Sequence, residues 1–135
     1  MEKKVLLVMH RKMLSDALVA RAAMGARFSL IAEGNYAAAA LTAEATSPEI
    51  VVVEIPESGP WKPAEKCLAL CDVIRRQKKD CKQVVLCCES DETSCHAAIH
   101  AKQARRIDDF LFYDNSVHYL FSKLEALLER EDAPT

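Results

Sequence analysis

Residues 48–55, Pro48-Glu49-Ile50-Val51-Val52-Val53-Glu54-Ile55, decide the fold of this chain. Their apolar run ends at Glu54, and an earlier apolar run, Val5-Leu6-Leu7-Val8, ends at Met9-His10. Short apolar runs between polar residues are typical of strands that are buried in a parallel sheet. Side chains just past the carboxyl ends of such strands line the crevice where open α/β sheets bind ligands. Met9, His10 and Glu54 are therefore the first candidate site residues.

The composition indicates one globular domain. The chain has 135 residues, half of them hydrophobic, and its formal net charge is −2, which describes an ordinary globular protein. A nucleic-acid-binding surface would need a basic stripe. The basic clusters at residues 75–79 and 102–106 lie at the expected ends of helices, where they complement the helix dipole. We therefore expect no nucleic-acid partner.

Two further observations concern the location of the protein. No apolar run approaches the ~20 residues that a membrane span needs, so we expect no membrane association. The apolar run that follows Met1-Glu2-Lys3-Lys4 is too short for the core of a signal peptide. These features favour a cytoplasmic protein, in which the six cysteines are expected to be reduced thiols.

Strand and helix signals alternate five times along the chain. Asn35 is a candidate N-cap, Ser90 or Asp91 is another, and Asn115 or Ser116 begins the last helix. Strands are expected at 4–9, 28–32, 49–55, 83–88 and 109–113, and helices at 12–24, 36–45, 64–79, about 91–104 and 117–129.

The first helix is expected to bury Met13, Leu14, Leu18 and the alanines on the same face. The segment 56–63 contains three prolines and a glycine, so it is expected to be a loop. Alternating strands and helices with short connections predict a parallel sheet with right-handed crossovers. One domain is expected at residues 1–130, followed by a short polar tail at 131–135.

Three stretches together resemble the receiver domain of two-component response regulators. They are Lys3-Lys4-Val5-Leu6-Leu7-Val8 with Arg11-Lys12-Met13-Leu14 two residues later, then residues 48–55, and then Asp108-Asp109-Phe110-Leu111-Phe112-Tyr113. The resemblance covers about residues 3–129. It implies a flavodoxin-like, doubly wound α/β fold with a five-stranded parallel sheet in the order 2-1-3-4-5 and helices on both faces.

The resemblance also implies where a phosphorylation site would lie. In receivers, an acidic pair after the first strand holds a divalent cation, and an aspartate after the third strand takes the phosphoryl group. A hydroxyl after the fourth strand and a lysine after the fifth contact the phosphoryl oxygens. The corresponding residues here are Met9 and His10, Glu54, Cys88 or Cys87, and Tyr113.

Every one of these positions departs from the receiver pattern. Met9 and His10 offer no hard oxygen ligands to magnesium. With the metal ligands and the lysine both replaced, little remains to stabilise a transferring phosphoryl group. We therefore expect no phosphorylation, no bound metal, no cofactor and no enzyme activity.

The function predicted from this pattern is a phosphorylation-independent, receiver-like signalling module of a two-component or phosphorelay system, acting by protein–protein contact. Two accounts of the site stay open. The site is either a decayed remnant kept as scaffold, or Glu54 mimics a phosphorylated aspartate with one charge in place of up to ~2. The alternative function is a small α/β domain that binds a ligand in the strand-end crevice, although no glycine-rich phosphate loop supports it.

The remaining candidates concern contact surfaces and thiols. Phe110 matches the aromatic switch position of receivers, or is simply a half-buried strand residue. Trp61 indicates a partner contact if its indole is exposed. Arg105, Arg106 and His118 are expected in an interface with an unknown protein partner or in a homodimer. The cysteines are expected to pack in the core and not to form a metal or redox site.

Overall fold

The computed structural model describes residues 3–112 and 116–132, and it contains a five-stranded parallel sheet in the order β2-β1-β3-β4-β5. The strands are β1 (Lys3–Val8), β2 (Phe28–Glu33), β3 (Ile50–Glu54), β4 (Lys82–Cys87) and β5 (Asp109–Phe112). The helices are α1 (Lys12–Ala23), α2 (Ala39–Thr46), α3 (Ala64–Gln77), α4 (Glu92–Gln103) and α5 (Val117–Asp132), with a short 3₁₀ helix, η1 (Tyr36–Ala38), before α2. The predicted flavodoxin-like fold and strand order are confirmed.

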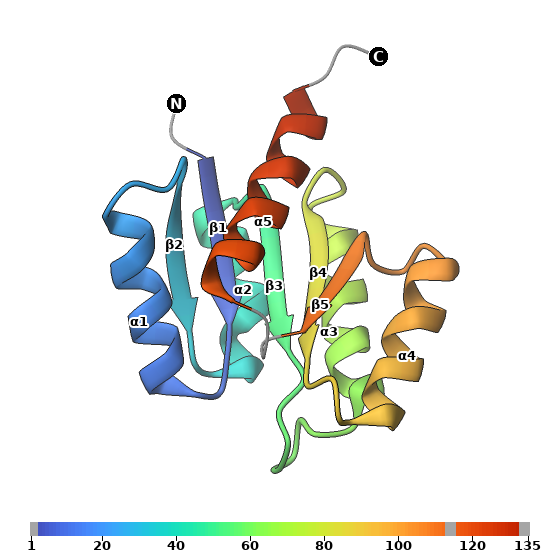
Figure 1. Ribbon diagram of the computed structural model, residues 1–135. Coiled ribbons are helices and arrows are strands. Elements are labelled where there is room, and N and C mark those ends of the chain that lie inside the picture. Colours follow the sequence, from blue (N-terminus) through green and yellow to red (C-terminus); the bar gives the residue numbers. More distant parts are fainter. Residues whose placement is uncertain (1–2, 113–115, 133–135) are drawn as a thin grey trace.

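Two layers of helices cover the sheet. Figure 1 shows α1 and α5 over one face and α2, α3 and α4 over the other. Successive side chains of a strand point to opposite faces of the sheet. Val5 and Leu7 therefore pack with α1 and α5, whereas Leu6 and Val8 pack with the helices on the other face. The three central strands are buried on both sides, which explains their continuous apolar runs.

The helix ends follow the local sequence. The Asn35 side chain accepts a hydrogen bond from the Ala37 amide at 3.1 Å, as predicted for an N-cap. Between the two cap candidates of α4, the structure selects Asp91, which accepts from the Ser94 amide at 3.2 Å. The Ser116 hydroxyl accepts from the Tyr119 amide at 3.1 Å, and Asn115 lies outside the described residues.

Several expected element boundaries differ from the structure. Residues 36–38 form a separate 3₁₀ turn instead of the first turn of an α-helix. Helix α5 continues to Asp132, into the segment predicted as a tail, because Glu and Arg favour helix and the first strong helix breaker in the sequence is Pro134. The expected burial of Met13 is wrong: its side chain is 88% exposed. The expected burial of Leu18 and Ala22 is confirmed, and Ser15 completes the buried face of α1 with the same three- and four-residue spacing.

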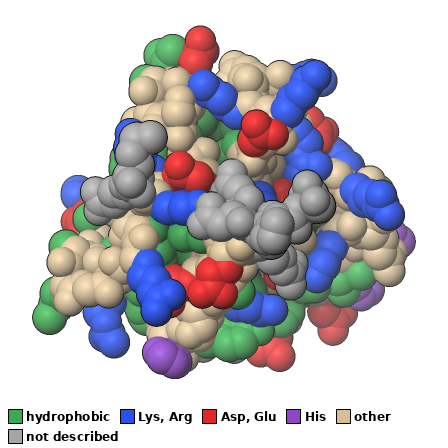
Figure 2. Space-filling model, turned by 90° about the horizontal axis from the view of Figure 1, so that it is seen from above, with side chains coloured by type: hydrophobic (Ala, Val, Ile, Leu, Met, Phe, Trp, Pro, Cys, Tyr) green, Lys and Arg blue, Asp and Glu red, His purple; other side chains and the backbone are tan. Residues whose placement is uncertain are grey.

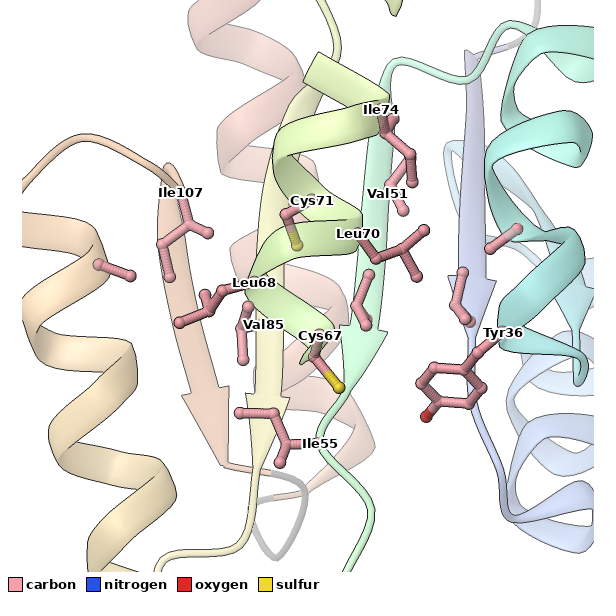
Figure 3. Packing of buried hydrophobic residues seen from close by; sticks show 14 of the residues in the cluster. Tyr36, Val51, Ile55, Cys67, Leu68, Leu70, Cys71, Ile74, Val85 and Ile107 are labelled. Atoms are coloured by element: carbon pink, nitrogen blue, oxygen red, sulfur yellow. The ribbon is translucent and has the colours of Figure 1, made fainter. Parts of the chain in front are cut away.

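Helix α3 packs its apolar side against β3 and β4. Figure 3 labels the side chains of α3 that belong to this buried cluster, and these are Cys67, Leu68, Leu70, Cys71 and Ile74. Four of the six cysteines are buried in this layer, Cys88 and Cys95 are partly exposed, and none of the six forms a disulfide. The prediction that the cysteines pack in the core is confirmed for these four.

Two observations concern the outer surface. Figure 2 views the molecule from the end where the strands begin, and Lys and Arg side chains are interspersed there with Asp and Glu. That end therefore presents a mixed surface without a patch of one sign among the described residues in view. Within the described ranges, no helix is long and apolar enough to cross a membrane.

Candidate functional site

The predicted site lies where β1 and β3 end side by side. The two strands are parallel and Val8 is paired with Val53, so the residues that follow them meet at the same edge of the sheet. Met9 does not face this crevice, because its side chain is buried with the α1–α5 layer. The side chain of His10 is exposed. Of the three residues first predicted here, only Glu54 brings its side-chain polar atoms into the site.

Glu54 is fully buried, with 0% of its surface exposed. Its Oε1 accepts a hydrogen bond from the His10 backbone amide at 2.9 Å. Its Oε2 lies 3.6 Å from Nε of Arg11 and accepts no hydrogen bond from the described residues. Arg11 also pairs with Glu57, with 3.3 Å between Nη2 and Oε1. One guanidinium therefore connects the β1–α1 connection to the β3–α3 loop.

The electrostatics of Glu54 reflect two opposing effects. Burial raises the pKa of the Glu54 carboxyl above its ordinary value, because the charged form loses its hydration. The His10 amide and the Arg11 guanidinium stabilise the charged form and offset part of that rise in pKa. The net result is that the pKa of Glu54 stays above that of a carboxyl in water.

A second set of contacts holds the backbone of Glu54. The hydroxyl of Tyr36 donates a hydrogen bond to the Glu54 carbonyl at 2.6 Å, and the Tyr36 side chain is buried. The Tyr36 ring lies against Trp61, with 5.4 Å between centroids and a tilt of 31°. The thiol of Cys67 donates to the Trp61 carbonyl at 3.2 Å. These contacts connect the end of β3 to the loop 56–63.

These groups are weak acids. Burial, with a smaller contribution from the nearby Glu54 charge, raises the pKa of the Tyr36 hydroxyl far above its ordinary value. The same two causes raise the pKa of the Cys67 thiol to about 12. Both side chains are therefore protonated hydrogen-bond donors at neutral pH.

Sequence reasoning missed Arg11, Glu57 and Tyr36. Arg11 and Glu57 are polar residues in the two connections that follow the site strands, and that position was a usable signal. Tyr36 is the one aromatic residue in an alanine-rich stretch, directly after the cap Asn35. Its contact with Glu54 joins elements that only the fold brings together.

The two cysteines at the end of β4 have different environments. Cys87 is buried in the α2–α4 layer, and this burial raises the pKa of its thiol to about 12. Cys88 is partly exposed, and its Sγ lies 3.1 Å from the Ser90 hydroxyl. The carbonyl of Cys88 accepts from the Cys95 thiol at 3.3 Å. Of the two candidates for the hydroxyl position, Cys88 is the one that solvent reaches.

At the fifth strand, Tyr113 lies outside the described residues. Phe110 is half-buried and packs edge-on against Phe112, with 6.0 Å between ring centroids. The ammonium of Lys102 lies 5.8 Å from the centroid of Phe110 and pairs with Asp109 at 3.0 Å. This position agrees with a half-buried strand aromatic, and a switching role for Phe110 stays a prediction.

The candidate interface residues lie in different places. Arg105 and His118 are exposed, and Trp61 is partly exposed. Arg106 instead turns towards α3, where its guanidinium binds Glu65 at 2.7 Å and Asp72 at 2.8 Å. Arg106 therefore joins α3 to the connection before β5, and a variant at this residue would disturb the fold as well as any interface.

The site contains few groups that hold metal ions. Among residues 3–112 and 116–132, no three or more His, Cys, Asp or Glu side chains are arranged to hold a metal. Where receivers hold a cation, Glu54 is the buried carboxylate among the described residues, and Arg11 already lies beside it. The site therefore consists of the buried Glu54 carboxyl with the guanidinium of Arg11 beside it.

Comparisons with known proteins support the fold. No family model and no curated protein matches the sequence. A response regulator from Thermotoga maritima superposes with a TM-score of 0.74 at 18% identity, covering 96% of this chain and 99% of that one. A LuxR-family DNA-binding response regulator from Staphylococcus aureus has a TM-score of 0.73 at 16% identity, covering 93% and 98%.

A structure described as adenylate cyclase from Rhodopirellula baltica is also similar, with a TM-score of 0.80 at 15% identity over 98% of this chain and 91% of that one. At these identities, the likeness concerns the fold. The chain has the fold of a response-regulator receiver domain, as its sequence predicted.

Proposed function

We propose that this chain is a receiver-like signalling module of the two-component type that acts by protein–protein contact and is not phosphorylated. The observation that carries this proposal is the buried Glu54 carboxylate, hydrogen-bonded to the His10 amide and lying beside Arg11. A phosphoacceptor must be reached by a donor and by a metal ion, and this carboxylate has no exposed surface.

The chemistry around Glu54 supports the proposal. Phosphoryl transfer depends on positioned positive charge, which is usually supplied by a divalent cation. Such cations require several oxygen ligands. Here Met9 packs in the core, His10 contributes its backbone amide, and Arg11 lies next to the Glu54 carboxylate. The guanidinium of Arg11 thus supplies a positive charge beside Glu54 that does not depend on a metal.

The contacts of Arg11 also support a module that stays in one conformation. It pairs with Glu54 at 3.6 Å and with Glu57 at 3.3 Å, so it ties together two loops at the strand ends. Of the two accounts of Glu54, this arrangement favours the one in which Glu54 mimics a phosphorylated aspartate and its charge stabilises one conformation. In that account no phosphoryl group is needed to reach the signalling state.

The first test is incubation with acetyl phosphate and magnesium, followed by intact-mass analysis. We expect no phosphoryl adduct on this chain, whereas a receiver with a complete acidic pair, treated in parallel, should be modified. Glu54→Asp should also stay unmodified, because the change does not restore the metal ligands. A stoichiometric, acid-labile adduct on the unaltered chain would refute the proposal.

Magnesium binding provides an independent test. One carboxylate beside an arginine is a poor site for a hard cation. Calorimetric titration with millimolar magnesium should therefore show no saturable heat. A one-to-one isotherm that disappears in Glu54→Gln would contradict the proposal.

We further propose that the surface of α4, β5 and α5 mediates contact, with self-association as its simplest form. Ile99 is 39% exposed and Tyr119 is 43% exposed on this surface, and His118 and Arg105 are also exposed. Sedimentation should show weaker association for Ile99→Asp with Tyr119→Asp. The matched control is Leu41→Asp, because Leu41 is 70% exposed on α2, which is not part of this surface. A monomer at all concentrations would exclude self-association through this surface.

A further inference from the structure

A hollow of about 450 Å³ lies on the outer side of α3, next to the loop 56–63. Its lining consists of Trp61, Lys66, Ala69, Leu70 and Val73. Four of these five side chains are apolar, and Trp61 is the single tryptophan of the chain. Tryptophan is enriched among the residues that contribute most to binding at protein–protein interfaces.

The hollow is held in shape by contacts beneath it. The indole of Trp61 lies against the ring of Tyr36, and the Trp61 carbonyl accepts from the Cys67 thiol at 3.2 Å. Pro60 and Pro63 restrict the backbone on either side. Because the indole is already positioned, a ligand that binds there need not order it, and this lowers the entropic cost of binding.

Charge distinguishes the two flanks of α3. The flank towards Arg106 carries Glu65 and Asp72, and both carboxylates bind that guanidinium. Lys66 lines the hollow, and Lys62, the residue after Trp61, is exposed and close enough to Asp91 to help lower the pKa of that carboxyl. The nearest carboxylates of α3 are therefore engaged on its other flank, and Lys66 is the charged residue that lines the hollow.

The hollow is also connected to the buried site. Trp61 contacts Tyr36, and the Tyr36 hydroxyl donates to the Glu54 carbonyl at 2.6 Å. Only one side chain thus separates the surface indole from the residue at the phosphoacceptor position. A partner seated on Trp61 would contact the same structural unit that holds the end of β3.

We propose that this hollow is the docking site for an amphipathic helix of a partner protein. An apolar side chain of that helix enters beside Trp61 and Val73, and its acidic flank pairs with Lys62 and Lys66. Helices commonly bind grooves through apolar residues at i, i+3 or i+4, and i+7. Opposite charges at the rim then set orientation and association rate. The inference rests on the proposed function, because it names the kind of protein that such a module contacts.

The experiment uses the emission of Trp61 as a direct signal. The full chain is titrated with a synthetic helical peptide that carries Leu at i, i+3, i+4 and i+7 and Glu on both flanks. A second peptide has Lys in place of every Glu. We expect a saturable shift of the Trp61 emission to shorter wavelength with the acidic peptide, and much weaker binding of the basic one.

Charge reversal tests the site itself. Lys62→Glu combined with Lys66→Glu should weaken binding of the acidic peptide about tenfold, since two exposed ion pairs contribute modestly each. Lys79→Glu, at an exposed lysine beyond the end of α3, is the matched control and should leave binding unchanged. Circular dichroism should show that all variants remain folded.

Three outcomes would overturn the docking site. They are the absence of any saturable emission change, equal binding of the acidic and basic peptides, and equal weakening by Lys79→Glu. Emission that shifts with protein concentration alone would instead assign the hollow to a second copy of the chain, and the proposed helix partner would then be wrong. The phosphorylation test is independent: a phosphorylated chain that still binds the peptide refutes the proposed function but retains the docking site.

Discussion

The two layers that cover the sheet differ in the chemistry of their packing. The α1–α5 layer is built almost entirely from aliphatic and aromatic carbon, and Leu18, Leu120 and Leu124 are typical members. The α2–α4 layer contains all four buried cysteines and Tyr36. In that layer, hydroxyl and thiol groups donate to backbone carbonyls at the end of β3 and in the loop 56–63. Both layers bury apolar side chains, and the second layer also connects the buried site to the surface.

The largest effect should come from the aliphatic layer. Leu124→Ala removes a buried side chain of α5 and leaves a cavity, so we expect a loss of about 2–5 kcal/mol in the free energy of unfolding. Cys71→Ala, at an equally buried position of α3, removes only one sulfur and should cost about 1 kcal/mol. Urea unfolding measures both changes. Equal losses would show that the two layers do not differ in this way.

A smaller effect is expected at the polar contact of the other layer. Tyr36→Phe keeps the ring but removes the hydroxyl that donates to the Glu54 carbonyl, so it should cost about 1–3 kcal/mol. Tyr119→Phe, on the exposed side of α5, should stay within about 0.5 kcal/mol of the unaltered chain. If the two substitutions cost the same, the Tyr36 hydrogen bond does not stabilise the end of β3.

The pH dependence of stability should identify the buried acid. The folded-state pKa of Glu54 is raised by burial, so the folded protein binds this proton more tightly than the unfolded chain does. Its contribution to stability is therefore present below the unfolded-state pKa of glutamate and is lost as pH rises through the folded-state pKa. Glu54→Gln lacks this titration and should gain stability relative to the unaltered chain over that interval.

The measurement for this prediction is urea unfolding of both proteins at a series of pH values. The matched control is Glu44→Gln at an exposed position of α2, which should follow the unaltered chain. A stability difference between the unaltered chain and Glu54→Gln that does not change with pH would contradict the raised pKa.

The smallest change in stability is expected at the edge of the second layer. Cys88→Ser replaces a partly exposed thiol and should alter the free energy of unfolding by less than about 0.5 kcal/mol. In contrast, Cys67, Cys71 and Cys87 are buried thiols with pKa values of about 12. They should react slowly with iodoacetamide at neutral pH, because the thiolate is the nucleophile.

Mass analysis of peptides after brief labelling tests this order of reactivity. Cys88 should be modified before the three buried cysteines, and all should react after unfolding in urea. Labelling of Cys71 or Cys87 as fast as Cys88 in the folded protein would indicate that the second layer opens readily.

The sequence was most informative where a local pattern implies a unique arrangement. The apolar runs ending at Val8 and Glu54 predicted buried parallel strands, because a strand covered on both faces cannot alternate polar and apolar residues. The alternation with helices then predicted a parallel sheet, and the resemblance to receiver domains implied its strand order. The expected face of α1 was accurate for Leu18 and Ala22 but not for Met13, since the apolar spacing of a helix leaves its edge residues undecided and only packing exposed Met13.

By itself, therefore, the sequence determined the receiver-like fold, the position of Glu54 at the end of β3 and the replacement of the acidic pair by Met9-His10. Only the tertiary structure decided that Met9 packs in the core, that Arg11 lies beside Glu54 and that Tyr36 joins Glu54 to Trp61. The physical reason is distance along the chain. Period and propensity act over a few residues, whereas these contacts join segments that become neighbours only when the strands pair and the helices pack.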